Sequence, residues 1–134
     1  MDIKGTYQLK KAFTGFDDDF NVKYISREDA LKVSLEEDSD DGLIMAAIYS
    51  RTVVEVTDKN IFIKFDTEFD DLAKKIADAN GMAPNDGKYY VMKYNVKKTK
   101  DNKFKVTSED GEDSGEVEFT NDEFELMFNV YERI

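Results

Sequence analysis

The chemistry open to this chain is limited by two residue types that it lacks. The sequence contains no cysteine and no histidine, which excludes thiol nucleophiles, imidazole bases, most zinc sites and the common catalytic triads. Carboxylates remain, with 30 acidic against 19 basic side chains. Catalysis by carboxylates alone needs two acids on facing walls of a site, whereas most acids here fall at turn or outward positions. We therefore expect a protein that is not an enzyme and that carries no cofactor.

The densest acidic run is the best candidate for a metal site. It places Asp38, Asp40 and Asp41 directly before Gly42. An EF-hand calcium loop needs a glycine at its sixth position and a bidentate acid at its twelfth. Aligning Gly42 with the sixth position puts Ile48 at the twelfth, so the register fails. We expect a solvated acidic turn and no metal.

The overall charge bears on the choice of partner. A formal net charge of −11 at pH 7 would repel nucleic-acid phosphates and anionic membrane surfaces. No apolar run approaches the ~20 residues that a membrane-spanning helix needs. We expect a small molecule or a basic protein as the partner, with no direct contact to nucleic acid and no membrane span. The first four residues lack the apolar core of a signal peptide, so we expect a cytoplasmic protein, or a secreted or periplasmic one if a leader was removed.

Aromatic side chains offer a second kind of chemistry, the binding of a ligand. The chain has seven tyrosines and ten phenylalanines. Tyr90, Met92 and Tyr94 recur at every second position, against Lys93 and Asn95, and should share one inward strand face. Phe104 and Phe119 occupy further inward positions. A buried tyrosine hydroxyl needs a partner, which the polar end of a ligand or a water molecule can supply. Aromatic residues on strands are also common as plain core, so these positions predict either a cavity lining or a filled core.

The elements that position these residues are mainly strands. Apolar and polar residues alternate through residues 88–134, which predicts four successive strands broken by turns at 101–102, 110–115 and 121–122. Residues 3–13 predict a first strand, and residues 52–65 predict a hairpin that turns at 58–60. An antiparallel meander of this length must close on itself or be covered, because exposed edges invite association. We therefore expect a mainly β fold with residues 1–134 in one domain: a closed antiparallel barrel of about eight strands with one or two short helices.

One helix is indicated clearly and a second region is ambiguous. Residues 69–80 place Phe69, Leu72, Ala73 and Ile76 on one face, with Asp66 or Thr67 as the cap, and this helix should lie across the barrel or plug one end. Within residues 20–50, Ser26 resembles a helix start, yet residues 31–35 alternate like a strand. The apolar run 43–49 suits a buried helix or a buried strand, and an aspartate cap slightly favours the helix.

Three stretches carry a family resemblance: Gly5-Thr6-Tyr7-Gln8-Leu9 followed by Gly15-Phe16-Asp17, then residues 52–69, and finally Asn129-Val130-Tyr131-Glu132-Arg133. Together they resemble the fatty-acid-binding branch of the calycins, the small barrels related to lipocalins. The resemblance implies a β-barrel that binds a small apolar or amphipathic molecule. In that family an arginine two residues before the final tyrosine holds the ligand carboxylate, and this position is Asn129 here, with Tyr131 retained. The resemblance adds Asn129 and Tyr131 to the candidate binding residues and implies a neutral or weakly polar head group.

The last strand leaves the state of the interior open. If residues 124–130 form one strand, one face carries Phe124, Leu126, Phe128 and Val130. The other face then carries Met127, Asn129 and Tyr131. Apolar residues facing inward would fill the barrel and leave Tyr131 outside, and we expect this register because it buries the larger apolar area. The two functional hypotheses follow from this choice: a calycin-like binding protein for a small molecule, or a filled, acidic interaction module that mimics nucleic acid and binds a basic protein.

Overall fold

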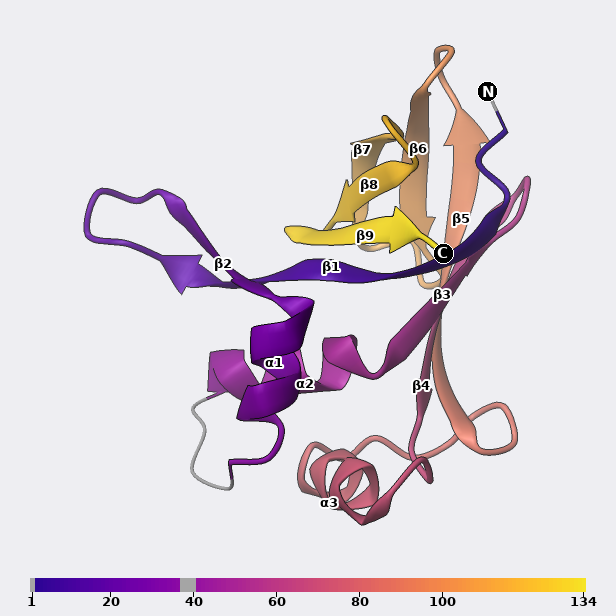
Figure 1. Ribbon diagram of the computed structural model, residues 1–134. Coiled ribbons are helices and arrows are strands. Elements are labelled where there is room, and N and C mark those ends of the chain that lie inside the picture. The colour runs from indigo at the N-terminus through magenta and orange to yellow at the C-terminus, as the bar shows by residue number, and fades with distance from the viewer. Residues whose placement is uncertain (1, 37–40) are drawn as a thin grey trace.

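The chain folds into an antiparallel sheet that curls into a nearly closed barrel, with helices packed below it (Figure 1). A computed structural model describes residues 2–36 and 41–134, so Asp38 and Asp40 of the acidic run lie outside the described residues. Within these ranges the elements are β1 (Gly5–Phe16), β2 (Val22–Ser26), α1 (Arg27–Val33), α2 (Asp41–Ser50), β3 (Thr52–Val56), β4 (Asn60–Asp66), α3 (Asp71–Ala79), β5 (Tyr89–Lys98), β6 (Lys103–Ser108), β7 (Ser114–Glu118), β8 (Glu123–Leu126) and β9 (Asn129–Arg133). No helix among them is long and apolar enough to cross a membrane.

Strand β1 brings the two ends of the chain together. Eight strands follow one another in the order β7-β6-β5-β4-β3-β1-β9-β8, and all neighbours are antiparallel. The first half of β1 pairs with β3 on one side and with β9 on the other. Its second half extends beyond the barrel and pairs with β2. The mainly β, barrel-like fold expected from the alternation is therefore confirmed, with three helices in the described ranges, one more than expected.

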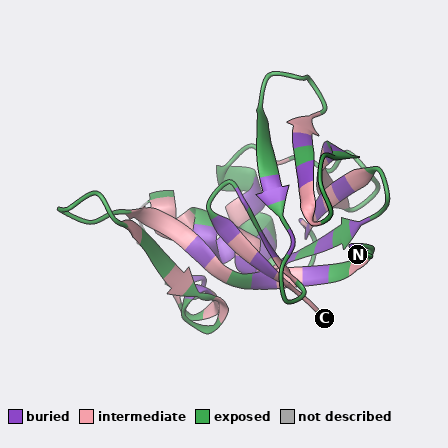
Figure 2. Ribbon diagram, turned by 90° about the horizontal axis from the view of Figure 1, so that it is seen from above, coloured by how far each residue is buried: buried purple, intermediate pink, exposed green. Residues whose placement is uncertain are grey.

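The interior is apolar because buried positions alternate with more exposed ones along the barrel strands, most regularly in β3 and β4, where they recur at every second position. In β1 the buried residues are Tyr7, Leu9 and Ala12, and the longer last step follows a register shift between Leu9 and Lys11. Figure 2 shows buried and exposed residues mixed along the strands. One cluster joins the barrel strands with Ala30 of α1 and Ala46 of α2. A smaller cluster of Ile48, Phe65, Ala73 and Ala77 joins α2 and α3 to the end of β4. The helices thus cover one end of the barrel.

The ambiguous region, residues 20–50, resolves into one strand and two helices. Ser26 caps α1, and its hydroxyl accepts a hydrogen bond from the Asp29 amide at 3.2 Å. The apolar run 43–49 lies within α2, so the helical interpretation is confirmed there. The alternation at residues 31–35 is not a strand, because α1 continues to Val33.

The third helix is shorter than expected. Its cap is Asp70, whose carboxylate accepts from the Ala73 amide at 2.6 Å and also binds Arg51 at 3.0 Å. The hydrogen bond from the Ala73 amide, and after it the Arg51 guanidinium, hold the pKa of Asp70 below its usual value, while burial of the carboxylate acts in the opposite direction. The expected cap at Asp66 or Thr67 is wrong, and Phe69 is 67% exposed rather than part of the packed face. Ala73 is buried as expected.

The C-terminal region contains five strands where the alternation predicted four. Met127 and Phe128 have φ values of +52° and +70°, which makes them the two central residues of a tight hairpin turn. This turn separates β8 from β9 and pairs Leu126 with Asn129. The single strand expected over residues 124–130 is therefore wrong. Periodicity could not show the turn, because both of its residues are apolar and lack the usual Asn-Gly signature.

Candidate ligand-binding site at the seam between β7 and β8

The barrel wall is incomplete between β7 and β8. The connection is a tight turn in which the amides and carbonyls of Thr120 and Glu123 bond to each other at 2.9 and 3.0 Å. From this turn β7 pairs with β6 and β8 pairs with β9. Within the described part of the chain, the Thr120–Glu123 bridge is the sole pairing that joins the two sides. The strands therefore diverge and leave a seam.

A cleft of about 380 Å³ opens at this seam, and we call it the seam cleft. Its lining comes from β5, β6 and β7, from the residue before β7, from the end of β8 and from the turn after it: Tyr94, Val106, Asp113, Ser114, Gly115, Glu116, Val117, Glu125, Leu126, Met127 and Phe128. Tyr94, Val106, Val117 and Leu126 are buried and form its floor. Met127 and Phe128 are about half exposed and form its mouth.

Gly115 explains why the cleft is empty. It pairs with Val106, next to the Phe104–Val117 pair, so it occupies an inward position of β7. A Cβ atom built on Gly115 meets no heavy atom within 4 Å. The neighbouring inward positions of β6, β7 and β8 carry side chains. Because Gly115 has none, the barrel wall is open at this position. The sequence pattern predicts a turn that ends at Gly115. The signal it does carry is a glycine two residues before a strand valine, and glycine within a strand often marks a weak point of that strand.

The polar atoms of the cleft gather at its rim. The Tyr94 hydroxyl donates a hydrogen bond to the Met127 sulfur at 3.1 Å. Burial raises the pKa of Tyr94, and the negative charges of Asp113 and Asp110 contribute in the same direction. Glu116 lies 3.8 Å from the Lys103 ammonium, and Glu125 accepts a hydrogen bond from Tyr24 at 2.8 Å. The site therefore joins an apolar floor to an acidic rim.

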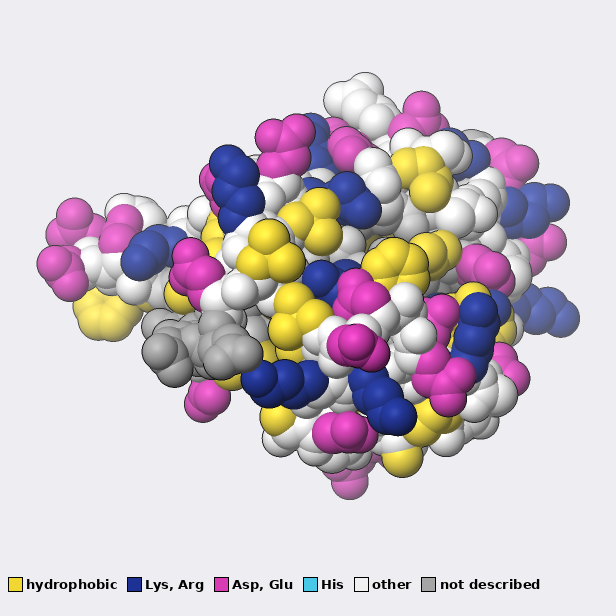
Figure 3. Space-filling model, turned by 60° about the horizontal axis from the view of Figure 1, so that its bottom comes forward, with side chains coloured by type: hydrophobic (Ala, Val, Ile, Leu, Met, Phe, Trp, Pro, Cys, Tyr) yellow, Lys and Arg dark blue, Asp and Glu magenta, His cyan; other side chains and the backbone are white. Residues whose placement is uncertain are grey.

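A second, smaller pocket lies under the helices. This helix-side pocket has a volume of about 200 Å³ and is lined by Met45, Ile48, Tyr49, Thr52, Ile63, Phe65, Asn80, Met82, Tyr90 and Met92. It contains two of the residues expected to bind a ligand, Tyr90 and Met92. On the face of the molecule that carries the helices, hydrophobic side chains show only in small groups among charged ones (Figure 3).

The seven residues expected at the binding site fall into three places. Tyr94 lines the seam cleft, and Tyr90 and Met92 line the helix-side pocket. Phe104 and Phe119 lie in the core, where their ring centres are 5.4 Å apart. The structure thus brings Tyr90 and Met92 together at the helix-side pocket, whereas Tyr94 lines the seam cleft and shares only an open groove beside β5 with Met92.

The remaining two, Asn129 and Tyr131, are both buried against the core. The Asn129 side-chain oxygen accepts from the Phe13 amide at 2.9 Å, and Asn129 is 5% exposed. Tyr131 is 1% exposed, and burial raises its pKa well above the usual value. The expectation that Tyr131 faces outward is wrong, because the turn at residues 127–128 places Phe124, Leu126, Asn129 and Tyr131 on the same inward face.

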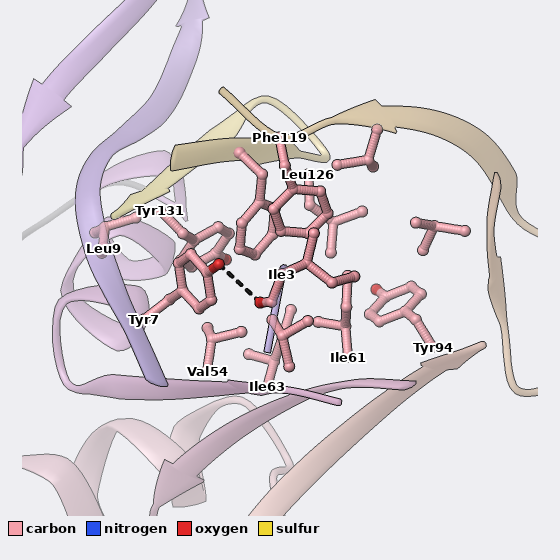
Figure 4. Close-up of a cluster of buried hydrophobic side chains, with 14 of the residues drawn as sticks. Ile3, Tyr7, Leu9, Val54, Ile61, Ile63, Tyr94, Phe119, Leu126 and Tyr131 are labelled. Atoms are coloured by element: carbon pink, nitrogen blue, oxygen red, sulfur yellow. Dashed lines mark hydrogen bonds between the residues drawn. The ribbon is translucent and has the colours of Figure 1, made fainter. Parts of the chain in front are cut away.

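The interior beside the turn that joins β7 to β8, where the seam is closed, is filled by an aromatic core. We use this name for Tyr7, Phe104, Phe119, Phe124 and Tyr131, whose successive ring centres lie 4.7 to 6.1 Å apart. The Tyr7 hydroxyl donates to the Ile3 carbonyl at 2.8 Å, and this bond ties the N-terminal segment into the barrel (Figure 4). In the same view Tyr94 lies on the far side of the cluster from Tyr7 and Tyr131. The barrel is therefore filled on one side and open on the other.

The chain can be compared with protein-family models, with curated proteins and with solved structures. No family model matches the chain, and no match was found among the curated proteins or the solved structures. Within the described ranges, no group of three acidic side chains is placed to hold a metal ion.

Proposed function

We propose that this protein is a non-enzymatic, calycin-like binding protein that takes one small apolar or amphipathic molecule into the seam cleft. The observation that carries the proposal is the cleft of about 380 Å³ with a buried apolar floor, at the place where the barrel wall lacks a side chain and a strand pairing. Ligand pockets typically measure about 300–1,000 Å³ and combine an apolar lining with a few polar groups. The seam cleft meets both conditions.

Size favours the seam cleft over the helix-side pocket. The helix-side pocket, at about 200 Å³, falls below the range of typical ligand sites. Its three methionines, Met45, Met82 and Met92, are flexible side chains that adapt to irregular space. We therefore assign Tyr90 and Met92 to packing beneath the helices and Tyr94 to the ligand.

The position of Asn129 supports a ligand without a carboxylate. In the calycin branch that the sequence resembles, this position carries the arginine that binds the fatty-acid head group. Here the Asn129 amide is buried and engaged by the Phe13 backbone at 2.9 Å, so it offers no charge to an acid. The rim of the seam cleft adds carboxylates rather than cations. A head group that carries no negative charge fits both observations.

Filling the cleft from within tests the proposal. The probe is decanol, titrated by calorimetry below its solubility limit against the native protein and against Gly115→Ala and Gly115→Phe. Because the Cβ of residue 115 enters open space, we expect affinity to fall slightly with alanine and at least tenfold with phenylalanine. Lys105→Phe adds the same ring at an exposed position of β6 and serves as the matched control. Equal decanol binding by the native protein and Gly115→Phe, or no heat with the native protein, would refute the proposal.

The projecting arm supports a second candidate function, the capture of a basic protein. β1 and β2 extend away from the barrel as a hairpin whose exposed tip carries Asp17, Asp18 and Asp19 (Figures 1 and 2). Phe16 and Phe20 flank these acids and are 54% and 85% exposed. Acidic and aromatic groups together suit a basic surface with an apolar depression.

A polylysine column tests this candidate. We expect retention that weakens with salt and that drops when all three tip aspartates become asparagine, with Phe20→Ser reducing it further. The control variant replaces three acids of the loop at residues 109–113 instead, which keeps the net charge equal. Equal retention of the two triple variants would show that the total charge, and not the arm, determines binding.

A further inference from the structure

We infer that the seam cleft selects an amphipathic ligand with a cationic head, a primary alkyl ammonium, and that Asp113 is the residue that recognises it. This inference rests on the proposed function and names the ligand class for the same site. The cleft is lined by three carboxylates, those of Asp113, Glu116 and Glu125, and by no lysine or arginine among the described residues. An ammonium at the mouth would therefore meet opposite charge on several sides while its chain enters the apolar floor.

Asp113 differs from the other two carboxylates because it is unpaired. Glu116 is paired with Lys103, and Glu125 accepts from the Tyr24 hydroxyl. The Asp113 carboxylate makes no hydrogen bond or ion pair with any residue that the structure describes. It can therefore bind a ligand without first giving up a partner.

The backbone holds Asp113 at the cleft. Its carbonyl accepts from the Ser108 amide at 2.8 Å, and its amide donates to the Ser108 hydroxyl at 3.0 Å. The Ser108 hydroxyl in turn donates to Asp110 at 2.5 Å, and Asp110 also accepts from the Glu112 amide. The backbone of this loop is therefore held by its own hydrogen bonds. These bonds do not use the Asp113 carboxylate, which lies at the wall of the cleft.

Tyr94 offers a second acceptor for the ammonium. Its hydroxyl gives its hydrogen to the Met127 sulfur, which leaves the oxygen lone pairs for a donor. The charge of Asp113 acts on this hydroxyl, since it contributes to the raised pKa of Tyr94. A primary ammonium has three donors and can use the carboxylate and the phenol oxygen at once. A carboxylate head would meet repulsion from the same groups.

Three ligands with the same alkyl chain test the inference: decylamine, decanol and decanoate, each titrated below its critical micelle concentration at pH 7 and low salt. For the native protein we expect decylamine to bind roughly fivefold more tightly than decanol, the upper end of what one exposed ion pair contributes, and decanoate to bind most weakly. The preference should shrink towards unity in about 1 M salt, where the screening length is about 3 Å.

Asp113→Asn should remove the preference for the amine, measured as the ratio of the decylamine and decanol affinities of the same variant. Asp101→Asn is the matched control, because it changes the net charge equally at an exposed turn between β5 and β6 that does not line the cleft. Equal amine and alcohol affinities in the native protein would overturn the cationic ligand class, and a preference that survives Asp113→Asn would overturn the role of Asp113.

The decanol arm separates these failures from a failure of the proposed function. If decanol binds the native protein and not Gly115→Phe, the cleft is a binding site whatever the head-group result. If decylamine alone binds and Gly115→Phe does not weaken it, the amine is held by surface charge, and both the site and the inference are refuted.

Discussion

The aromatic core and the seam cleft are two parts of one barrel interior, and β8 contributes to both. Phe124 stacks on Tyr131 with ring centres 5.2 Å apart, whereas Leu126, two residues further on the same face, borders the open cleft. The difference arises across the seam: Phe119, which follows β7, packs against Phe124 at 4.7 Å, while Gly115 brings no side chain to the position nearer Leu126. A barrel can thus be filled at one end and hollow at the other without any change in strand order.

The comparison also shows how the structure separates stability from binding. The aromatic core holds the two ends of the chain, since Tyr7 binds Ile3 and Arg133 binds the Lys4 carbonyl at 2.7 Å. The seam cleft has no comparable role, because its floor lies beside empty space and its turn is already closed by the Thr120–Glu123 bridge. The same substitution should therefore have different effects in the two regions.

The largest difference is expected for leucine truncation. Leu9 is fully buried beside Tyr131, whereas Leu126 is 7% exposed and lines the cleft. Leu→Ala costs about 2.7–5 kcal/mol depending on the cavity that remains. We expect Leu9→Ala to cost about 4–5 kcal/mol and Leu126→Ala about 2–3 kcal/mol, because the second site already borders open space. Urea midpoints with unchanged m-values measure this, and equal costs would show that the cleft floor is packed as tightly as the core.

Tyrosine hydroxyls should show a smaller contrast. The Tyr7 hydroxyl donates to the Ile3 carbonyl and accepts from Arg133 at 3.0 Å, so Tyr7→Phe removes two hydrogen bonds from a buried position and should cost about 1–3 kcal/mol. Among the described residues the Tyr94 hydroxyl bonds to the Met127 sulfur alone, so Tyr94→Phe should stay within about 0.5 kcal/mol. Chemical denaturation of the two variants decides this. A larger cost at Tyr94 would reverse the comparison.

The aromatic core and the seam cleft should also differ in how much they contribute to the loss of stability at high pH. Burial raises the pKa of Tyr131 in the folded state, and its stabilising effect is complete below the unfolded tyrosine pKa of about 10 and is lost as the pH rises through the folded pKa. Between these values the free energy of unfolding falls by about 1.4 kcal/mol per pH unit for one such group. Tyr131→Phe should therefore make the loss of stability above about pH 10 shallower.

Tyr94→Phe is the control for the alkaline experiment. The pKa of Tyr94 is also raised, by burial first and then by Asp113, so its replacement should change the slope in the same direction and by less. Urea midpoints measured at several pH values above neutrality give both slopes. Identical slopes for the native protein and Tyr131→Phe would mean that Tyr131 ionises without unfolding the core.

The sequence predicted the strands well because each barrel strand has one wet face. The hairpin of β3 and β4 shows this, since Val54 and Ile63 are buried at the expected alternate positions. The same rule failed at Met127 and Phe128, where a two-residue turn is apolar and reverses the chain. This one turn reverses the predicted side of Tyr131. If the strand is assumed to continue through the turn, every residue after the turn is assigned to the wrong face of the sheet.

The site was predicted only in part, for a different physical reason. Tyr94 was expected at a cavity from its inward position and does line one. Gly115 and Asp113 were not expected, because a cavity is defined by space between strands that are distant in sequence, and alternation within one strand does not report that space. The pairing of Gly115 with Val106 and the divergence of β7 from β8 are properties of the sheet.

The smallest expected effect is the one that most directly links the cleft to binding. Gly115→Val places a β-branched side chain at an inward strand position where its Cβ meets nothing within 4 Å and the backbone is not in the left-handed region. Glycine in a strand costs roughly 0.5–1 kcal/mol relative to alanine, so valine should stabilise the fold by about that amount. Gly111→Val is the contrasting variant, because Gly111 has a φ of +78° and should lose stability.

Gly115→Val should also weaken decanol binding. The informative result is that the same substitution raises the stability of the free protein and lowers its affinity for the ligand. If Gly115 served only the fold, replacing it would lower the stability of the protein or leave decanol binding unchanged. A glycine that keeps space for a ligand gives up stability in the empty protein, and the ligand restores it by occupying the same space. Thermal unfolding with and without decanol tests both halves: the variant should melt at a higher temperature alone and should gain less from the ligand than the native protein. If the variant gains as much as the native protein, the space beside Gly115 is not where decanol binds.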